Sequence, residues 1–341
     1  MMFSSRKFYL PMVDRKLYCR KEMKQMIVVF ASKRFVTPDT RDRDIIINTK
    51  EKLVHRLRQV FQESKSDSST VDPWERLWRD GLTPWDLGGP TPALVSEVQQ
   101  RPNHNLWRTA LLPGCGSGYD VVSLARFWDD CQVTKKEKQD TNSSYQRTVV
   151  GLDLSETSLH RAKQLLDESV QTHGSFSRTN ILLYQGDFFA GPSAWHLFHA
   201  EKPSNKQDTF DPVSVDTTNN PTFDFIFDYT FFCAIPPERR HDWGRVMTQL
   251  LSQKLHDSID QSGELLTLMF PYIPEPRTDC PGPPYLVSFR DYLAALDNTN
   301  TSEDGISLRL TTPSPYQSKD VVASRFGQEM VGWWKFESKK E

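Results

Sequence analysis

The sequence predicts an α/β fold in which helices cover both faces of a mostly parallel sheet. Three observations support this prediction. Apolar runs of strand length alternate with runs of helical spacing. One apolar run breaks into three glycines, Ala110-Leu-Leu-Pro-Gly-Cys-Gly-Ser-Gly118, and a helical pattern follows at once. A later run, Val149-Val-Gly-Leu-Asp153, ends in an acidic residue.

The glycine turn indicates a bound ligand. Glycines let the backbone approach a ligand closely, and in an open α/β sheet ligands bind at the carboxyl ends of strands. We therefore expect a nucleotide-like cofactor here. One interpretation is a dinucleotide fingerprint, G-x-G-x-x-G, with pyrophosphate on the following helix. However, Gly114, Gly116 and Gly118 give G-x-G-x-G, and Tyr119 stands where the third dinucleotide glycine belongs.

The second interpretation requires a carboxylate at the end of the next strand to accept hydrogen bonds from a ribose, and Asp153 supplies it. Dinucleotide folds also carry such an acid, about 20 residues on. Here the interval from Gly114 is 39 residues (153 minus 114). The polar tract from Asp129 to Thr148 has the composition of an insertion, so spacing alone does not decide. Asp153 could also merely cap the helix that follows it.

Two helices are predicted before the glycine turn. Apolar positions between Ile45 and Gln62 share one helical face: Leu53, Val54, Leu57, Val60 and Phe61. Asp72 is a good N-cap for a short helix that begins at Pro73, and Glu75 has the position of a capping-box acid.

Strands and helices alternate after Asp153, which argues for a mostly parallel sheet. Ser155 can cap a helix that contains Leu159, Ala162, Leu165 and Leu166. The remaining expected elements are strands over Ile181–Phe189, Phe223–Tyr229 and Gly263–Phe270, a helix from Pro236 through Leu255, and a last strand within Gly327–Lys335. The polar stretch from Gly191 to Thr222 is interpreted as an inserted loop.

Three tryptophans, Trp74, Trp78 and Trp85, lie within twelve positions before the glycine turn. Most tryptophans serve core or interface packing. A functional interpretation is that their faces surround a cation, because a positive centre is attracted to the ring quadrupole. On the residues alone, the packing interpretation is the simpler one.

Composition excludes several classes of protein. With 42 Lys and Arg against 44 Asp and Glu, the chain has no global field to attract nucleic acid or an anionic membrane. It has no apolar run long enough to span a bilayer. Five scattered cysteines without a C-x-x-C pair are typical of reduced thiols rather than a disulfide framework or a zinc site.

The segment Met1 to Phe35 is basic, as a mitochondrial targeting segment would be. Its serine content is low and it lacks an amphipathic stripe, so we expect a cytoplasmic protein. We expect a basic N-terminal extension over residues 1–44 and one domain over residues 45–341, with inserted loops near 129–148 and 191–222.

With these residues laid out, the chain resembles the thiopurine methyltransferase family of S-adenosylmethionine-dependent enzymes, and within it the plant and fungal halide/thiol methyltransferases. Eight segments in family order carry the resemblance: Trp74-Glu-Arg-Leu-Trp78, Gly81-Leu-Thr-Pro-Trp-Asp-Leu-Gly88, Leu111-Leu-Pro-Gly-Cys-Gly-Ser-Gly-Tyr-Asp120, Val150-Gly-Leu-Asp-Leu-Ser155, Gly186-Asp-Phe-Phe189, Phe223-Asp-Phe-Ile-Phe-Asp-Tyr229 with Phe232-Cys-Ala-Ile235, Gly263-Glu-Leu-Leu-Thr-Leu-Met269 and Gly282-Pro-Pro-Tyr285.

The resemblance implies a class I methyltransferase (Rossmann-like) fold, whose sheet has seven strands, with S-adenosylmethionine across the ends of the first strands. By position, Trp74, Trp78 and Trp85 would contact the methionine part and cover the site, and Gly114 would line the carboxypropyl side. Asp153 would hold the ribose hydroxyls. Asp187 and Phe188 would bracket the adenine, although Phe188 could instead be a core residue.

The resemblance also implies that Tyr229 stands at a strand end facing the methyl group, which makes it the candidate catalytic residue. It could equally be a packing residue. Tyr229, Phe231, Phe232 and Cys233 are candidates for an aromatic cup around the acceptor, with Trp85 and Phe232 in contact with it. No His neighbours Cys233 in the sequence, so a packed thiol is expected there rather than a nucleophile.

The expected reaction is transfer of the sulfonium methyl to a small soft nucleophile: a thiol, bisulfide, thiocyanate or halide. Such an in-line displacement needs positioning and desolvation more than proton removal, so we expect neither a catalytic triad nor a metal. We also expect a monomer. Two alternatives remain open at this stage: a nicotinamide-dependent oxidoreductase, and a non-catalytic cofactor-binding regulatory protein.

Overall fold

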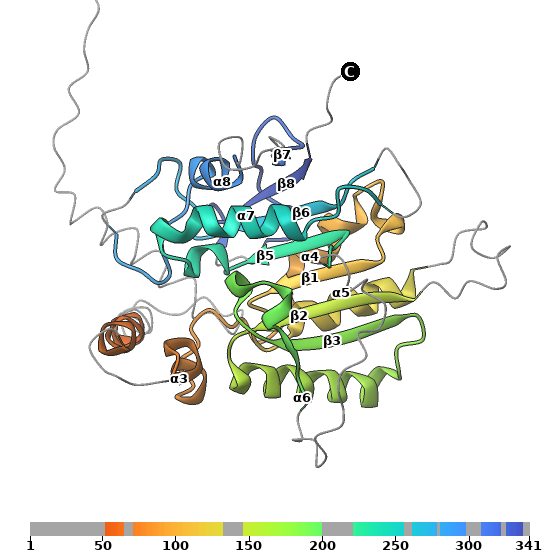
Figure 1. Cartoon of the computed structure of the whole chain (residues 1–341), viewed down its shortest axis with the longest axis horizontal. Coiled ribbons are helices and arrows are strands. Elements are labelled where there is room, and N and C mark those ends of the chain that lie inside the picture. The colour runs from red at the N-terminus through yellow and green to blue at the C-terminus, as the bar shows by residue number, and fades with distance from the viewer. Residues whose placement is uncertain are drawn as a thin grey trace, which may run out of the picture.

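A computed structural model describes residues 52–64, 71–131, 146–199, 221–255, 261–277, 280–297, 308–321 and 325–336. Its centre is an eight-stranded sheet with the order β4-β3-β2-β1-β5-β6-β8-β7 (Figure 1). The strands are β1 (Thr109–Pro113), β2 (Arg147–Asp153), β3 (Thr179–Gln185), β4 (His196–Leu197), β5 (Phe225–Tyr229), β6 (Glu264–Met269), β7 (Leu308–Leu310) and β8 (Met330–Phe336). The five strands from β3 to β6 run parallel, whereas β4 and β8 pair antiparallel to their inner neighbours.

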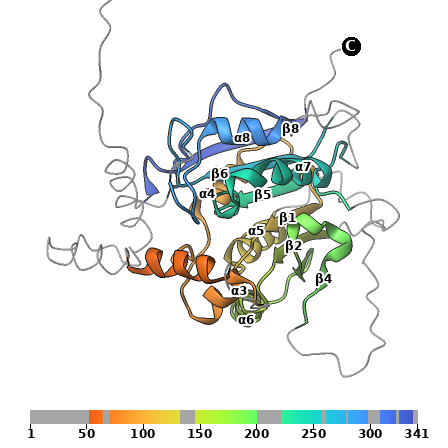
Figure 2. The same cartoon turned by 60° about the vertical axis from the view of Figure 1, so that its left-hand side comes forward.

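Helices cover both faces of this sheet (Figures 1 and 2). They are α3 (Pro73–Arg79), α4 (Pro92–Gln99), α5 (Tyr119–Asp130), α6 (Glu156–His173), α7 (Arg240–Leu250) and α8 (Phe289–Leu296), together with a helix over residues 52–64. Short 3₁₀ turns complete the set: η1 (His104–Leu106), η2 (Phe188–Ala190), η3 (Pro192–Ala194), η4 (Phe232–Ala234) and η5 (Pro237–Arg239). The predicted α/β architecture is confirmed.

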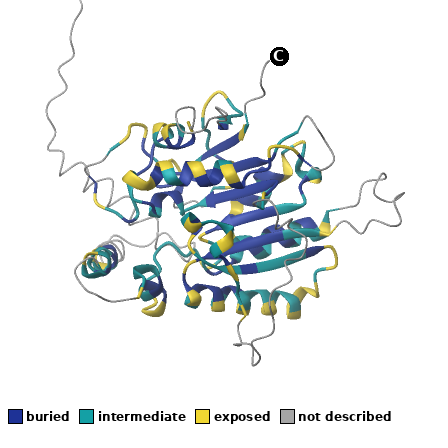
Figure 3. Ribbon diagram, viewed as in Figure 1, coloured by how far each residue is buried: buried dark blue, intermediate teal, exposed yellow. Residues whose placement is uncertain are grey.

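The core is divided by the sheet into two apolar layers. Side chains alternate across a strand, so Ala110 and Leu112 of β1 join one layer with α4 and α5, while Leu111 joins the other with α7 and α8. Figure 3 shows the central strands as the most buried part of the molecule. This two-layer burial holds the carboxyl ends of β1, β2, β3 and β5 at one edge, where the loops that follow them meet.

Three expectations from the sequence need correction. The sheet has eight strands rather than seven, because His196 and Leu197 pair with the end of β3. The helix that follows Pro236 ends at Leu250 and not at Leu255, since Leu251 turns to an extended conformation and bridges Phe223. Cys115, Cys131 and Cys233 are free thiols as expected, but Cys280 is disulfide-bonded.

Several predicted features lie outside the described residues. They include the basic segment 1–44, most of the tract between α5 and β2, and residues 200–220 of the second predicted insertion. The first part of that insertion is packed on the protein: Trp195 is buried, and its indole N–H donates to the backbone oxygen of Asp187 (3.1 Å). Within the described ranges, no helix is long and apolar enough to cross a membrane.

Candidate functional site

The glycine turn between β1 and α5 forms one wall of the site. Gly114 and Gly116 both have positive φ, +63° and +54°. A Cβ on Gly114 would lie 2.6 Å from Cδ2 of Phe231, and one on Gly116 would lie 3.2 Å from Cζ2 of Trp78. Both positions therefore need glycine for conformation and for space. The turn brings the backbone of β1 directly against aromatic rings from two other segments.

Asp153 ends β2 beside this turn and is 9% exposed. One carboxylate oxygen accepts from the amide of Gly116 (2.9 Å), and the other accepts from the amide of Ser155 (2.9 Å). Burial raises the pKa of Asp153, and these amide hydrogen bonds oppose the rise. The Asp153 carboxylate thus fixes the glycine turn against the end of β2.

The three tryptophans form a roof over the glycine turn, and we use this name for Trp74, Trp78 and Trp85. Trp85 lies edge-on to both others, with ring centroids 5.4 Å from Trp74 and 5.9 Å from Trp78. Helix 52–64 packs behind them through Leu57 and Val60, and Phe61 meets Trp74 at 4.9 Å. The roof is therefore anchored by its own small core.

These groups enclose a cavity of about 300 Å³. Seven of the residues implied by the resemblance line it: Trp74, Trp78, Trp85, Gly114, Asp153, Asp187 and Phe188. Phe231 and Cys233 of the expected aromatic cup line it as well. The residues come from α3 and the loop after it and from the carboxyl ends of four strands, so the fold brings together groups that are far apart in the sequence.

Asp187 and Phe188 stand at the carboxyl end of β3. The carboxylate of Asp187 caps η2 by accepting from the amide of Phe189 (2.9 Å), and the Asp187 side chain faces solvent. Phe188 is buried and lies edge-on to Phe189 and to Phe231, with centroids at 5.4 Å and 5.1 Å. At this side of the cavity, Asp187 is therefore the polar, exposed residue and Phe188 the apolar, buried one.

Tyr229 lies apart from the large cavity. It lines a second space of about 80 Å³ on the other side of the glycine turn. Its hydroxyl donates to Oε2 of Glu329 (2.8 Å), and the guanidinium of Arg325 lies over its ring at 5.0 Å. The two spaces are neighbours, because five residues line both: Trp78, Trp85, Gly114, Gly116 and Thr230.

Phe232 does not line either cavity. It is fully buried and stacks on Tyr292, with centroids 4.0 Å apart. Its neighbour Cys233 lines the large cavity, yet burial and then the charge of Asp228 raise the pKa of its thiol well above the usual range. The thiol is therefore protonated at neutral pH, as a packed cysteine would be.

Sequence reasoning missed other residues of the site. Thr230 lines both spaces and has a φ of +59°, an uncommon backbone conformation for threonine that often marks a functional position. Asp72 lines the large cavity beside Trp74. Arg239 also lines it, with its guanidinium 3.9 Å from the ring centre of Phe189. The local pattern marks Asp72 only as a helix cap and does not single out Thr230 or Arg239.

The charges that line the large cavity favour a cation. Three carboxylates, those of Asp72, Asp153 and Asp187, stand against one guanidinium, that of Arg239. Six aromatic side chains line the same space: Trp74, Trp78, Trp85, Phe188, Phe189 and Phe231. A cavity at the carboxyl ends of the strands is where open α/β sheets bind their ligands, so the fold and this lining define a cofactor-binding α/β protein of the kind that class I methyltransferases exemplify.

Comparison with known proteins agrees with this class. The family model described as thiopurine S-methyltransferase matches residues 69–132 and 208–304. A probable thiol methyltransferase 2 of Arabidopsis thaliana is 34% identical over 82% of this chain and 90% of that protein. Thiocyanate methyltransferase 1 of Brassica oleracea is 34% identical over 77% of this chain and 84% of that protein.

Solved structures show weaker similarity. Magnesium protoporphyrin IX methyltransferase from Synechocystis shares 14% identity, with a TM-score of 0.38, over 82% of this chain and 92% of that chain. The identity to the two plant relatives, together with the family model, shows that the chain belongs to the thiopurine S-methyltransferase family. It is a methyltransferase that uses S-adenosylmethionine, so the nicotinamide interpretation of the glycine turn does not apply.

Proposed function

We propose that this enzyme methylates a small soft nucleophile, namely a thiol, bisulfide, thiocyanate or halide. The observation that carries the proposal is the cavity itself. Its walls are aromatic, its charged lining is mainly acidic, and the roof covers the glycine turn. Such a space suits a cofactor with a positive sulfur and a small acceptor rather than a polymer. The activities named for the two plant relatives support the same choice.

The roles of the cavity residues follow from where each stands. We assign the ribose hydroxyls to Asp153, the adenine to Asp187 and Phe188, and the carboxypropyl side to Gly114. The roof is assigned to the sulfonium, because a cation is attracted to indole faces by about 0.5–2 kcal/mol per contact. These assignments fit the positions of Asp153 and Gly114, which both line the cavity at the carboxyl ends of neighbouring strands.

Tyr229 is proposed to contact the methionine end of the cofactor. The proposal is supported by the position of Tyr229 in the small space, which adjoins the large cavity at Gly114 and Thr230. Because its hydroxyl already donates to Glu329, Tyr229 offers its ring and an oxygen lone pair rather than a proton. We therefore assign it a binding role in place of acid or base chemistry.

Bound S-adenosylmethionine supplies an activated methyl group that a soft nucleophile displaces directly. The protein then has to orient the acceptor and exclude water from it. Phe231 and the roof provide apolar surface for this purpose, and an acceptor that arrives as an anion needs no general base. The protonated thiol of Cys233 serves as wall and not as nucleophile.

An acceptor panel tests the proposal. The purified chain is incubated with methyl-labelled S-adenosylmethionine and with iodide, thiocyanate, sulfide or a small thiol, and volatile products are measured in the headspace. Methyl iodide, methyl thiocyanate, methanethiol or a methyl thioether is the expected product. Absence of product from every soft nucleophile would refute the proposal, provided that calorimetry shows S-adenosylhomocysteine bound to the same preparation.

A further inference from the structure

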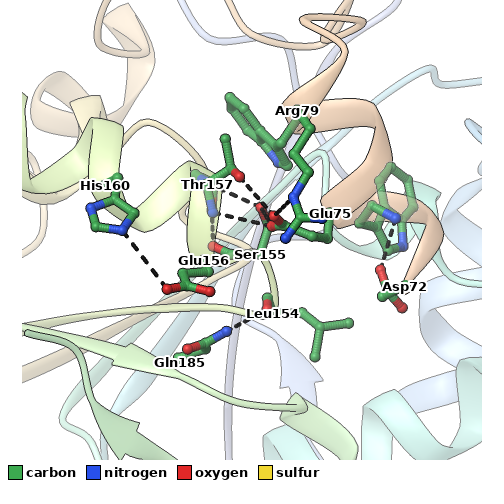
Figure 4. Close-up of polar contacts among 12 residues, drawn as sticks. Asp72, Glu75, Arg79, Leu154, Ser155, Glu156, Thr157, His160 and Gln185 are labelled. Atoms are coloured by element: carbon green, nitrogen blue, oxygen red, sulfur yellow. Dashed lines mark hydrogen bonds and ion pairs between the residues drawn. The ribbon is translucent and has the colours of Figure 1, made fainter. Parts of the chain in front are cut away.

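Glu75 belongs to α3, but its side chain binds residues at the start of another helix, α6. The sequence pattern predicts that it completes a capping box on α3, and this expectation is wrong. Its carboxylate accepts from the hydroxyl of Ser155 (2.6 Å), from the hydroxyl of Thr157 (2.7 Å) and from the amide of Thr157 (3.1 Å). Arg79 completes the set with an ion pair at 2.6 Å. Figure 4 shows these contacts converging on Glu75.

The partner of Glu75 is the N-terminus of α6. Ser155 caps this helix, and its hydroxyl also accepts from the amide of Ser158 (3.1 Å). A helix N-terminus carries unpaired N–H groups and a partial positive charge, so it binds a carboxylate favourably. Burial alone would raise the pKa of Glu75, but the hydrogen bonds from Ser155 and Thr157 outweigh it and lower the pKa. The residue is thus ionised at neutral pH.

A continuous set of hydrogen bonds runs from the glycine turn to the roof. The amide of Gly116 donates to Asp153, the amide of Ser155 donates to the other oxygen of Asp153, and the hydroxyl of Ser155 donates to Glu75. Glu75 does not line the cavity, whereas Trp74 and Trp78 on the same helix do. Glu75 is 9% exposed, so this connection is largely shielded from water.

We propose that Glu75 is a positioning residue that fixes the roof over the cofactor by binding the N-terminus of α6. This inference rests on the proposed function, in which Trp74, Trp78 and Asp153 hold S-adenosylmethionine. The same loop that presents Asp153 to the ribose is tied through Glu75 to the indoles at the other side of the cavity. Loss of the carboxylate frees α3 without removing any group that touches the cofactor.

The test compares Glu75→Gln with Glu156→Gln. Glu156 lies in the first turn of α6 but faces solvent: its side chain is 50% exposed, and its carboxylate lies 3.9 Å from His160. We expect the Glu75 variant to bind S-adenosylhomocysteine at least tenfold more weakly and to raise the KM for S-adenosylmethionine similarly. Its kcat at saturating cofactor should stay within twofold of wild type, because the substitution weakens binding of the cofactor equally in the ground state and in the transition state. The Glu156 variant should match the wild type.

Thr157→Val provides a milder second variant. It removes one hydroxyl donor to Glu75 and leaves the cap residue Ser155 in place. We expect a smaller loss of affinity in the same direction, and the double variant with Glu75→Gln should lose less than the product of the two single effects. Affinity within twofold of wild type for both single variants would overturn the proposal, as would fully independent effects.

Amide hydrogen exchange separates this inference from the proposed function. Without any ligand, amides of residues 74–79 should exchange at least tenfold faster in Glu75→Gln than in the wild type, whereas those of α7 should not change. Equal exchange in α3 would overturn the positioning role. A wild-type protein that binds no S-adenosylhomocysteine yet shows this difference in exchange would refute the proposed function alone.

Discussion

The carboxylate of Asp153 and the amide of Gly116 are joined by a 2.9 Å hydrogen bond, which ties the end of β2 to the turn after β1. The acid that we assign to the ribose therefore also shapes the backbone on which the cofactor would lie. Its binding role and its structural role must be separated by experiment, because one substitution removes both.

Asp153→Ala should lower the affinity for S-adenosylhomocysteine by about 100-fold, since hydrogen bonds to a charged group contribute about 1.5–3 kcal/mol. The melting temperature should fall by a few degrees, because the amides of Gly116 and Ser155 lose their acceptor. Asp129→Ala is the matched control: Asp129 likewise accepts backbone amides, from Ser177 and Arg178, but does not line the cavity. Unchanged affinity in a folded Asp153 variant would contradict its ribose role.

Gly114→Ala should abolish cofactor binding, whereas Gly81→Ala should not. Both glycines have positive φ, so either substitution strains the backbone by roughly 1–2 kcal/mol. Only at Gly114 does the added methyl collide, at 2.6 Å from the ring of Phe231. Calorimetry and thermal melts on both variants check this expectation. Similar affinities for the two would show that close approach at Gly114 is unimportant.

Arg239→Gln should raise the KM for iodide or thiocyanate by about fivefold, which corresponds to about 1 kcal/mol for an exposed ion pair. Three carboxylates line the cavity and repel an anionic acceptor, whereas Arg239 supplies the positive charge among the cavity-lining residues. The difference from wild type should shrink in high salt. Arg245→Gln, an exposed change on α7, is the control. Equal KM values at low salt would count against this role.

Asp228 should make the protein less stable as the pH rises from 4 to 7. Its carboxylate is buried against Trp243 and the amide of Phe232, and burial raises its pKa from 3.8 to about 7. Between these values the folded state keeps a proton that the unfolded state has released. The free energy of unfolding therefore falls with pH by up to about 1.4 kcal/mol per pH unit.

Asp228→Asn lacks this titration. Compared with the variant, the wild type should lose stability between pH 4 and pH 7, and the difference should become constant above pH 7. Urea unfolding at several pH values measures it, with Asp242→Asn on the exposed face of α7 as control. If the free energies of unfolding of the wild type and the Asp228 variant changed in parallel with pH, the pH dependence could not be assigned to Asp228.

Much of the site could be predicted from sequence because parallel strands bring their carboxyl ends to one edge. Gly114, Asp153 and Asp187 each follow a short apolar run, so their convergence follows from the alternating pattern once the fold class is known. The tryptophans were harder to assign. Their spacing fits ordinary packing equally well, and only the resemblance to a family implies that they cover a cofactor; the structure shows that all three line the cavity.

What the sequence could not predict are contacts between distant segments. Glu75 follows the local rule for a capping box, but its partners Ser155 and Thr157 lie 80 and 82 residues away. The hydroxyl of Tyr229 binds Glu329 at a separation of 100 residues. The short strand β4 has only two residues, too few to show a period. Local patterns carry no information about such pairings.

The roof belongs to a stretch of chain that precedes β1, and the described part of that stretch lends no strand to the sheet. Its lifting would break side-chain contacts and leave every strand ladder intact. In the roles proposed above, cofactor affinity depends on these side-chain contacts, whereas the cohesion of the sheet depends on its strand ladders. Substitutions before residue 91 should therefore change cofactor affinity at little cost to the melting point.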